Sequence, residues 1–252
     1  MKNSWETVTV DNSPMRLYLS QPDGPGPFPA MVVIQNQDGV GAFTQEMTRR
    51  VAQAGYVGIA PELYHREGEP KTPDQVADIK RTRNDTHVIN DINAAVKFLR
   101  GCATADTSRL GIIGFCMGGR IAFLMAAADP SFKAAVDFYG GGVYSKWGDR
   151  PAPSELAANV SCPIQGHFGE LDKNPPPDEM RKLDAELTRL GKQHEFFFYA
   201  GAPHGFNRNG WDGYRPEADT TSWARTVEFL SKHLKTVMAE KAAAASKSRR
   251  GE

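Results

Sequence analysis

Short apolar runs alternate with helical patterns along most of this chain of 252 residues. The continuous apolar run at residues 29–34 is typical of a strand that is buried on both faces of a sheet. Further runs predict strands at residues 56–60, 110–114, 132–139, 163–168 and 194–199. Apolar positions at helical spacing predict helices between them, at residues 43–54, 74–100, 117–128, 178–190 and 221–238. This alternation predicts an α/β fold with a mostly parallel central sheet and helices on both faces.

One charged segment interrupts the alternation. Residues 64–73 are rich in His, Arg, Glu and Pro, and they predict an exposed excursion rather than core. The weak point at Asn84–Asp85 divides the helical stretch that follows into two helices. Because residues 64–83 are charged and punctuated by proline, we expect this segment to be mobile and to shape specificity.

No shift in composition and no internal repeat divides the chain, so residues 1–238 are predicted to form a single domain. Residues 239–252 are rich in alanine and then basic. We expect this low-complexity tail to be frayed or disordered, because a solvated terminus is commoner than a docking segment.

The charge balance and the apolar pattern exclude several classes of protein. Thirty basic residues balance thirty acidic ones, whereas proteins that bind nucleic acid or a membrane surface usually carry a basic excess. No apolar run approaches the roughly 18 residues of a transmembrane helix, and the polar N-terminus lacks the apolar stretch of a signal peptide. Three cysteines do not make a disulfide framework. We therefore expect a cytoplasmic protein with no nucleic-acid or membrane partner.

The strongest signal for chemistry is the sequence GFCMGG at residues 114–119, where a predicted strand passes into a helix. It has the form Gly-x-nucleophile-x-Gly, with Cys116 in place of serine. A nucleophile on such a tight turn leaves no room for side chains two residues away, so glycine suits both positions. The N-terminus of the following helix favours a thiolate. The alternative is a structural turn with an inert cysteine, which is what we expect of Cys102 and Cys162.

Two candidate partners follow Cys116 in the order that a hydrolase of this architecture requires. Asp172 lies in the turn after the strand at residues 163–168, and His204 follows the strand at residues 194–199. Each residue alone is more often a turn former or a loop residue. Together they predict a catalytic triad, in which His204 moves the proton and Asp172 orients the imidazole.

Hydrolysis of this kind also needs two N–H donors for the oxyanion. The backbone N–H of Met117 is one of them, and we expect the backbone N–H of Gln37 to be the other. The loop at residues 35–41 that carries Gln37 can also be a plain strand–helix connection. The six histidines are scattered without metal-ligand spacing, so no metal site is predicted.

With these residues the chain resembles the dienelactone hydrolase family, the carboxymethylenebutenolidases of the α/β-hydrolase superfamily. The resemblance covers residues 29–234, and its carriers are GYV with APELY at 55–64, GFCMGG at 114–119, GELD at 169–172 and HGF at 204–206. It implies a sheet of eight strands or a truncated version, a Cys-His-Asp triad, and neither a metal nor an organic cofactor. The family's namesake reaction opens a dienelactone to maleylacetate, and many relatives are esterases or lactonases.

One position departs from the family pattern. Namesake enzymes carry Gln-Glu where this chain has Gln35–Asn36, and there the Glu interacts with the resting thiol. Asn36 cannot accept a proton as a carboxylate does, so that activation step does not carry over directly. Asn36 is a candidate for contact with the substrate or the oxyanion, and Asp38 is close enough to supply a carboxylate if the loop is rearranged.

The resemblance further implies two arginines that hold an anionic substrate. Arg208 stands four residues after His204, where family members carry one of them. Arg81 and Arg83 are both candidates for the other, with a solvated helix face as the alternative. Four aromatic residues are candidate pocket walls, with core packing as the alternative for each: Tyr64, Tyr139, Trp147 and Trp211.

These features predict a hydrolase that cleaves a lactone or small carboxylic ester through a thioacyl intermediate on Cys116. One alternative is a broad carboxylesterase without preference for dienelactones. Another is a non-catalytic binding or redox-sensing protein that uses the same pocket, although such a protein does not need an intact triad. The expected partner is a small-molecule ester or lactone, and the expected assembly is a monomer or a homodimer.

Overall fold

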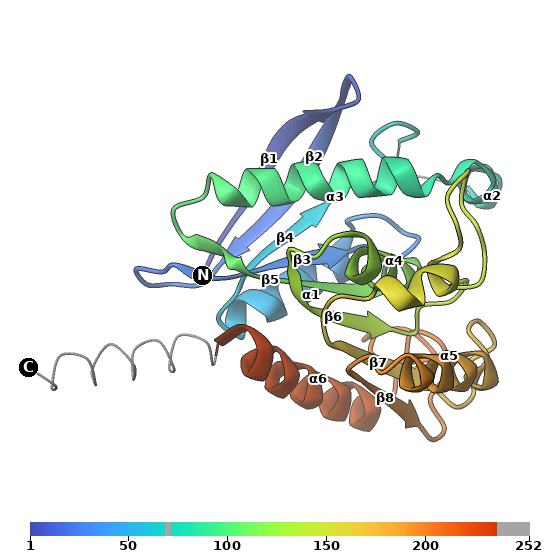
Figure 1. Ribbon diagram of the computed structural model, residues 1–252. Helices are drawn as coiled ribbons and strands as arrows, with labels where there is room; N and C mark the ends of the chain where they lie inside the picture. The colour runs from blue at the N-terminus through green and yellow to red at the C-terminus, as the bar shows by residue number, and fades with distance from the viewer. Residues whose placement is uncertain (69–71, 236–252) are drawn as a thin grey trace, which may run out of the picture.

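The computed structural model describes residues 1–68 and 72–235, which fold around one eight-stranded sheet (Figure 1). The strands are β1 Lys2–Val10, β2 Ser13–Gln21, β3 Phe28–Ile34, β4 Val57–Pro61, β5 Ala105–Phe115, β6 Phe132–Phe138, β7 Ile164–Gly169 and β8 His194–Tyr199. They lie in the order β1-β2-β4-β3-β5-β6-β7-β8, and all neighbours from β4 to β8 are parallel. The predicted α/β fold with a mostly parallel sheet is therefore confirmed.

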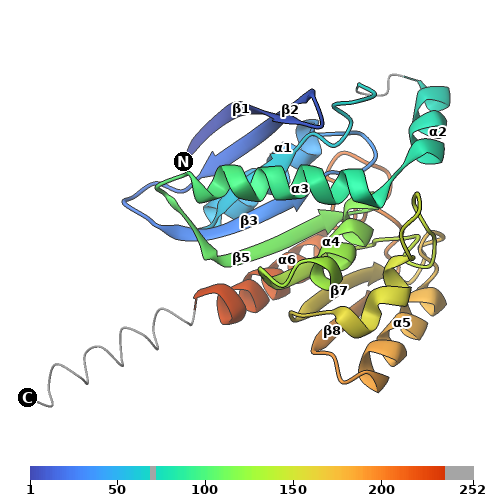
Figure 2. The same cartoon turned by 45° about the horizontal axis from the view of Figure 1, so that its top comes forward.

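Helices cover both faces of the sheet (Figures 1 and 2). They are α1 Ala42–Gln53, α2 Pro73–Thr82, α3 Asp85–Arg100, α4 Met117–Ala128, α5 Pro177–Arg189 and α6 Pro216–Leu230, with a 3-10 helix η1 Pro153–Asn159 and a π-helical turn η2 Ser231–Lys235. Buried residues of α3, α4 and α5 share one apolar cluster, whereas those of α1 and α6 share another. Because both faces are covered, the central strands are apolar throughout, as the run at residues 29–34 indicates.

An antiparallel hairpin at the N-terminus was not predicted. Strands β1 and β2 pair along their full length and are joined by Asp11 and Asn12, which have φ angles of 48° and 63°. Two such residues form the left-handed connection that suits the twist of a hairpin. Leu17 and Leu19 of β2 are buried and pair with β4, so the hairpin extends the sheet beyond its parallel part.

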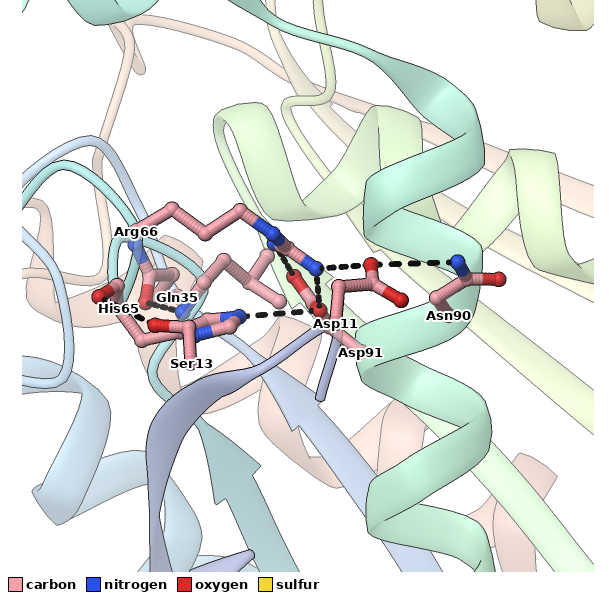
Figure 3. A network of polar contacts seen from close by, with 8 residues as sticks. Asp11, Ser13, Gln35, His65, Arg66, Asn90 and Asp91 are labelled. Atoms are coloured by element: carbon pink, nitrogen blue, oxygen red, sulfur yellow. Dashed lines mark hydrogen bonds and ion pairs between the residues drawn. The ribbon is translucent and has the colours of Figure 1, made fainter. Parts of the chain in front are cut away.

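The turn that follows β4 is anchored rather than exposed (Figure 3). Nε2 of His65 lies 3.1 Å from Oδ1 of Asp91 on α3. Nη1 of Arg66 donates to Oδ2 of Asp91 over 2.9 Å, and Nη2 reaches Oδ2 of Asp11 in the β1–β2 turn over 2.7 Å. The side chains of His65 and Asp91 are each 1% exposed. The prediction of an exposed excursion is therefore wrong for its first residues, because Asp91 contacts both His65 and Arg66 and offsets the burial of these polar side chains.

Helix α2 lies at the end of α3 and apart from the sheet (Figure 2). Thr72 caps α2 and Asn84 caps α3, so the predicted division of the helical stretch at Asn84–Asp85 is confirmed. The mobility expected of residues 64–83 stays a prediction, and residues 69–71 within that segment lie outside the described part of the chain.

The last helix α6 passes into η2, which ends at Lys235. Residues 236–252 lie outside the described residues, so the end of the helix predicted at residues 221–238 and the tail predicted at residues 239–252 stay predictions. Within residues 1–68 and 72–235, no helix is long and apolar enough to cross a membrane.

Candidate active site

Cys116 lies on a sharp turn between the end of β5 and the start of α4. Its backbone has φ 58° and ψ −119°, a conformation that a residue with a side chain rarely adopts. The N–H of Cys116 donates to the carbonyl of Phe138 over 2.9 Å, and the N–H of Gly119 donates to the carbonyl of Cys116 over 2.9 Å. These bonds hold a half-buried thiol at the N-terminus of α4, where the helix dipole favours negative charge.

Close backbone approach requires glycine on both sides of Cys116. A Cβ atom at Gly114 would collide with the carbonyl of Gly118. A Cβ atom at Gly118 would lie only 2.5 Å from the carbonyl oxygen of Ile34 in β3. The first turn of α4 therefore packs directly on the backbone of β3 and β5, which gives the GFCMG pattern its steric reason.

His204 and Asp172 come from the loops after β8 and β7, and they meet beside the sharp turn of Cys116. Nδ1 of His204 lies 2.9 Å from Oδ2 of Asp172, and the other carboxylate oxygen accepts the N–H of Asn174 over 2.8 Å. The Asp172 side chain is 0% exposed, whereas that of His204 is 28% exposed. Cys116, Asp172 and His204 line the same cavity, and Cys116 is close enough to help raise the pKa of the imidazole. The structure thus brings together the three residues predicted as a triad.

The surroundings of His204 favour its protonated form. Burial lowers the pKa of His204, but the hydrogen bonds to Asp172 and Cys116 and the charges of both groups outweigh burial and raise the pKa to about 10. The imidazolium therefore persists at neutral pH. Because the pKa lies above the ordinary value of 6.5, His204 stabilises the fold fully below pH 6.5, and that contribution is lost as the pH rises toward 10.

Tyr139 packs behind the imidazole rather than lining the cavity wall. The ring centroids of Tyr139 and His204 are 4.8 Å apart in an edge-on arrangement. The Tyr139 hydroxyl donates to Oδ1 of Asn207 over 2.6 Å, and its N–H donates to the carbonyl of His167 over 2.9 Å. The backbone of Tyr139 has φ 43°, so a second strained residue supports the site from the end of β6. At 2% exposure Tyr139 fits the core-packing alternative.

A cavity of about 510 Å³ contains the Cys116 and His204 side chains at the carboxyl edge of the sheet. Its lining comes from the loops after β3, β5, β7 and β8, namely Gln37, Cys116, Leu171, Asp172, Lys173, Asn174, Pro203, His204, Trp211, Asp212 and Gly213. Parallel strands place such loops at one edge, which explains why distant segments share a site. Gln37, predicted as an oxyanion donor, is part of this lining, and Met117 follows Cys116 at the start of α4.

Arg208 and Asp38 form an ion pair beside this cavity. Nη1 of Arg208 lies 2.7 Å from Oδ2 of Asp38, and the guanidinium carbon lies 5.4 Å from the ring centroid of Trp211. The side chain of Asn36 is used within its own loop, because its Oδ1 accepts the N–H of Asp38 over 3.0 Å. Asn36 is 7% exposed, so it shapes the turn that presents Asp38.

The other two candidate arginines lie in different surroundings. Arg81 is 73% exposed and pairs with a carboxylate of its own helix, as the solvated alternative predicts. The guanidinium carbon of Arg83 lies 4.7 Å from the ring centroid of Trp147. Arg83 and Trp147 line a separate cavity, together with Tyr64 and Met117. Of the two candidates, Arg83 is therefore the one that lines a cavity together with a residue of α4, Met117.

A buried ion pair behind the elbow was missed by the sequence analysis. Nη1 and Nη2 of Arg120 donate to the two carboxylate oxygens of Asp85 over 2.7 Å and 3.0 Å, and both side chains are 0% exposed. The ring centroid of Trp147 lies 3.5 Å from the guanidinium carbon. The available signal was a lone charged residue in the otherwise apolar helix at residues 117–128. The pair links α4 to the start of α3.

The mostly parallel sheet, the strained turn of Cys116 after β5, the carboxylate of Asp172 after β7 and the imidazole of His204 after β8 form the arrangement of an α/β-hydrolase. Among residues 1–68 and 72–235, no group of three or more His, Cys, Asp and Glu side chains is placed to hold a metal ion. The model of the dienelactone hydrolase family matches residues 15–234, and the chain belongs to this family. It is therefore a hydrolase of ester or lactone bonds.

Named relatives agree with this class. A Methylorubrum extorquens protein named "Putative carboxymethylenebutenolidase" is 35% identical over 231 residues, covering 90% of this chain and 79% of the relative. A Bradyrhizobium protein named "Probable 2-oxo-3-(5-oxofuran-2-ylidene)propanoate lactonase" is 33% identical over 238 residues, covering 91% of this chain and 94% of the relative.

Solved structures share the fold. A Klebsiella pneumoniae protein described as "Putative Dienelactone Hydrolase" superposes with a TM-score of 0.85 at 30% identity, covering 91% of this chain and 98% of the other. A dienelactone hydrolase-like promiscuous phosphotriesterase from metagenomic libraries superposes with a TM-score of 0.80 at 20% identity, covering 92% of this chain and 98% of the other. The predicted α/β-hydrolase fold is confirmed.

Proposed function

We propose that this hydrolase cleaves its ester or lactone bond by nucleophilic attack of Cys116, with His204 as the proton carrier and Asp172 as the orienting acid. The observation that carries the proposal is the position of His204, which hydrogen-bonds Asp172 through Nδ1 and lines the same cavity as Cys116, close enough for Cys116 to help raise the pKa of the imidazole. A histidine held in this way can receive a proton from a nucleophile and return it to a leaving group.

The first step transfers the acyl group to the enzyme. The sulfur of Cys116 attacks the carbonyl carbon and forms a C–S bond, while the carbonyl oxygen becomes an oxyanion. The backbone N–H groups of Met117 and Gln37 stabilise that oxyanion. The C–O bond then breaks, and the alcohol oxygen takes the electron pair and a proton from His204. An open ester releases its alcohol, whereas a lactone keeps it attached to the acyl group.

The second step returns the enzyme to its starting state. A water molecule gives a proton to His204 and attacks the thioester carbon. The C–S bond breaks, the electron pair returns to sulfur, and the carboxylic acid product leaves. Each ester or lactone bond therefore consumes one water molecule and needs no other reactant.

Arg208 is the candidate group for the carboxylate of an anionic substrate. One terminal nitrogen of Arg208 donates a hydrogen bond to Asp38. The Arg208 side chain lies beside the cavity and is 37% exposed. A guanidinium has five N–H donors, so a substrate carboxylate can bind beside Asp38 or displace it. The name of the Bradyrhizobium relative describes a lactone that also carries a propanoate group. We infer that a lactone with a carboxylate uses Arg208, and that a neutral ester does not need it.

Hydrolysis of a neutral ester and of a carboxylate-bearing lactone, by the wild type and by Arg208→Ala, tests this function. We expect the wild type to hydrolyse both. Arg208→Ala is expected to raise KM for the lactone by roughly 10- to 100-fold, because a charge-assisted hydrogen bond is lost. The matched control is Arg81→Ala, which removes an exposed guanidinium on α2 and is expected to change neither reaction.

Two results would separate the alternatives. If Arg208→Ala changes KM equally for the neutral ester and the lactone, the protein is a broad carboxylesterase with no carboxylate subsite at Arg208. If the wild type hydrolyses no ester or lactone, the proposed mechanism is wrong, and the pocket serves binding or redox sensing.

The pH dependence of the reaction provides a separate prediction. We expect the kcat/KM of the wild type to fall as the pH rises through about 10, where His204 loses the proton that the leaving group needs. Asp172→Asn removes the carboxylate that helps to raise the pKa of His204, so this alkaline limb is expected to move to lower pH. We also expect the rate at neutral pH to fall roughly 10²- to 10⁴-fold. An unchanged alkaline limb in Asp172→Asn would show that another group controls it.

A further inference from the structure

Part of the lining of the cavity that contains His204 is apolar. Leu171, Pro203 and Trp211 all line it, and we call these three residues the apolar rim. Leu171 is 59% exposed and Trp211 is 45% exposed, so both side chains offer apolar surface that a ligand can cover. Two rim residues are tied to the catalytic residues by sequence, because Leu171 directly precedes Asp172 and Pro203 directly precedes His204.

Trp211 is fixed in position by the turn that carries His204. A Cβ atom at Gly205 would collide with the indole ring, so the ring packs directly on the backbone of the residue after His204. Gly205 has φ 67°, a second reason for glycine there. The N–H of Trp211 donates to the carbonyl of Arg208 over 3.2 Å, and the Arg208 guanidinium lies beside the ring. A pre-positioned indole loses little freedom when a ligand covers it.

Leu171 is held next to the same turn. Its N–H donates to the carbonyl of Ala202 over 3.0 Å, which links the loop of Asp172 to the loop of His204. Polar and charged residues also line the cavity, but Lys173 and Asp212 are exposed and can keep their charges in water. Leu171, Pro203 and Trp211 therefore form an apolar part of the lining that contains His204.

We propose that the apolar rim binds the alcohol portion of the substrate, so that the preferred substrates are esters of apolar alcohols. His204 must lie within hydrogen-bond reach of the leaving oxygen in order to protonate it. The alcohol chain therefore extends from the reaction centre past the residues that surround His204. The oxyanion donors Met117 and Gln37 hold the carbonyl oxygen, and a cavity of about 510 Å³ has room for more than an acetyl group. This inference rests on the proposed function and narrows its substrate class.

A series of acetate esters tests the proposal, because the acyl group stays constant while the alcohol changes from ethyl to butyl to hexyl. We expect kcat/KM to rise about threefold to fourfold for each methylene group that the rim covers. Lengthening the acyl chain of ethyl esters instead is expected to give a smaller rise. Leu171→Ala, Trp211→Ala and the double variant are expected to flatten the alcohol series progressively.

The readout is the ratio of kcat/KM for hexyl acetate to that for ethyl acetate, measured within each variant. This ratio does not depend on the fraction of active protein, so partial misfolding of a variant does not hide the result. The matched control is Trp5→Ala, which removes a 39% exposed tryptophan from β1 and is expected to leave the ratio unchanged.

The possible outcomes are distinguishable. A flat alcohol series with turnover that depends on Cys116 overturns the rim proposal and leaves the proposed function intact. A rising series that persists in the double variant also overturns it, because other residues would then bind the alcohol. If no acetate is hydrolysed in a Cys116-dependent way, the proposed function fails and the rim proposal fails with it.

Discussion

Replacement of Cys116 by alanine is expected to lower the kcat/KM for p-nitrophenyl acetate by roughly 10³-fold or more. In the proposed mechanism the thiol is the protein group that bonds to the acyl carbon, and alanine has no nucleophilic atom to replace it. The oxyanion donors and the cavity remain in the variant, so weak residual hydrolysis is compatible with the mechanism. Initial rates of p-nitrophenolate release measure the effect.

Cys102→Ser is the matched control for this loss. Cys102 is also a half-buried free thiol, and burial raises its pKa, but it does not line the cavity that contains Cys116. We expect Cys102→Ser to keep the activity of the wild type. If Cys116→Ala hydrolyses the ester as fast as Cys102→Ser does, the nucleophile is elsewhere and the proposed mechanism is wrong.

The second large effect is expected on stability, at the buried ion pair of Arg120 and Asp85. Arg120→Met is expected to lower the free energy of unfolding by about 3–5 kcal/mol, because it leaves the Asp85 carboxylate buried without its partner. Arg120 also donates to the carbonyls of Gly142 and Ser145, over 3.1 Å and 2.8 Å, so the loop after β6 loses its anchor as well. Urea-induced unfolding at neutral pH measures the change.

A double variant distinguishes the ion pair from simple packing. In Arg120→Met with Asp85→Asn no buried charge is left unpaired, so the total loss is expected to be clearly smaller than the sum of the two single losses. Additive losses would contradict this account of the pair. The exposed pair of Arg189 and Glu186 offers the control, since Arg189→Met is expected to leave the unfolding midpoint almost unchanged.

The sequence was sufficient to predict the parallel part of the fold, and the three residues that it predicts as a triad lie in one cavity, whereas their catalytic roles stay predictions. Buried strands are continuous apolar runs, and a capped helix begins where Asn84 suggests, so local patterns carry this information. The positions of Cys116, Asp172 and His204 could be predicted because their order after successive strands can be read from the sequence. The sharp turn at Cys116 is also visible in the sequence, because close backbone contacts require glycine at positions 114 and 118.

Other features depend on contacts between residues that are far apart in the sequence, so local patterns do not predict them. The β1–β2 hairpin has one exposed strand, so its apolar pattern is weak, and only Asp11–Asn12 between alternating residues marks it. The pairing of Arg120 with Asp85 joins two helices and needs the tertiary structure. The same holds for Arg208, whose pairing with Asp38 spans most of the chain. The burial of His65 was missed because its partner on α3, Asp91, lies 26 residues further along the chain.

The most direct test of the central claim is to identify the covalent intermediate. Wild-type protein mixed with p-nitrophenyl acetate is quenched in acid within the first turnovers, digested, and analysed by peptide mass spectrometry. The mechanism predicts one acetyl group per chain, held as a thioester on Cys116, which disappears when substrate is exhausted and is absent in Cys116→Ala. Acetyl transfer to another residue during active turnover, with Cys116 unmodified, would contradict it.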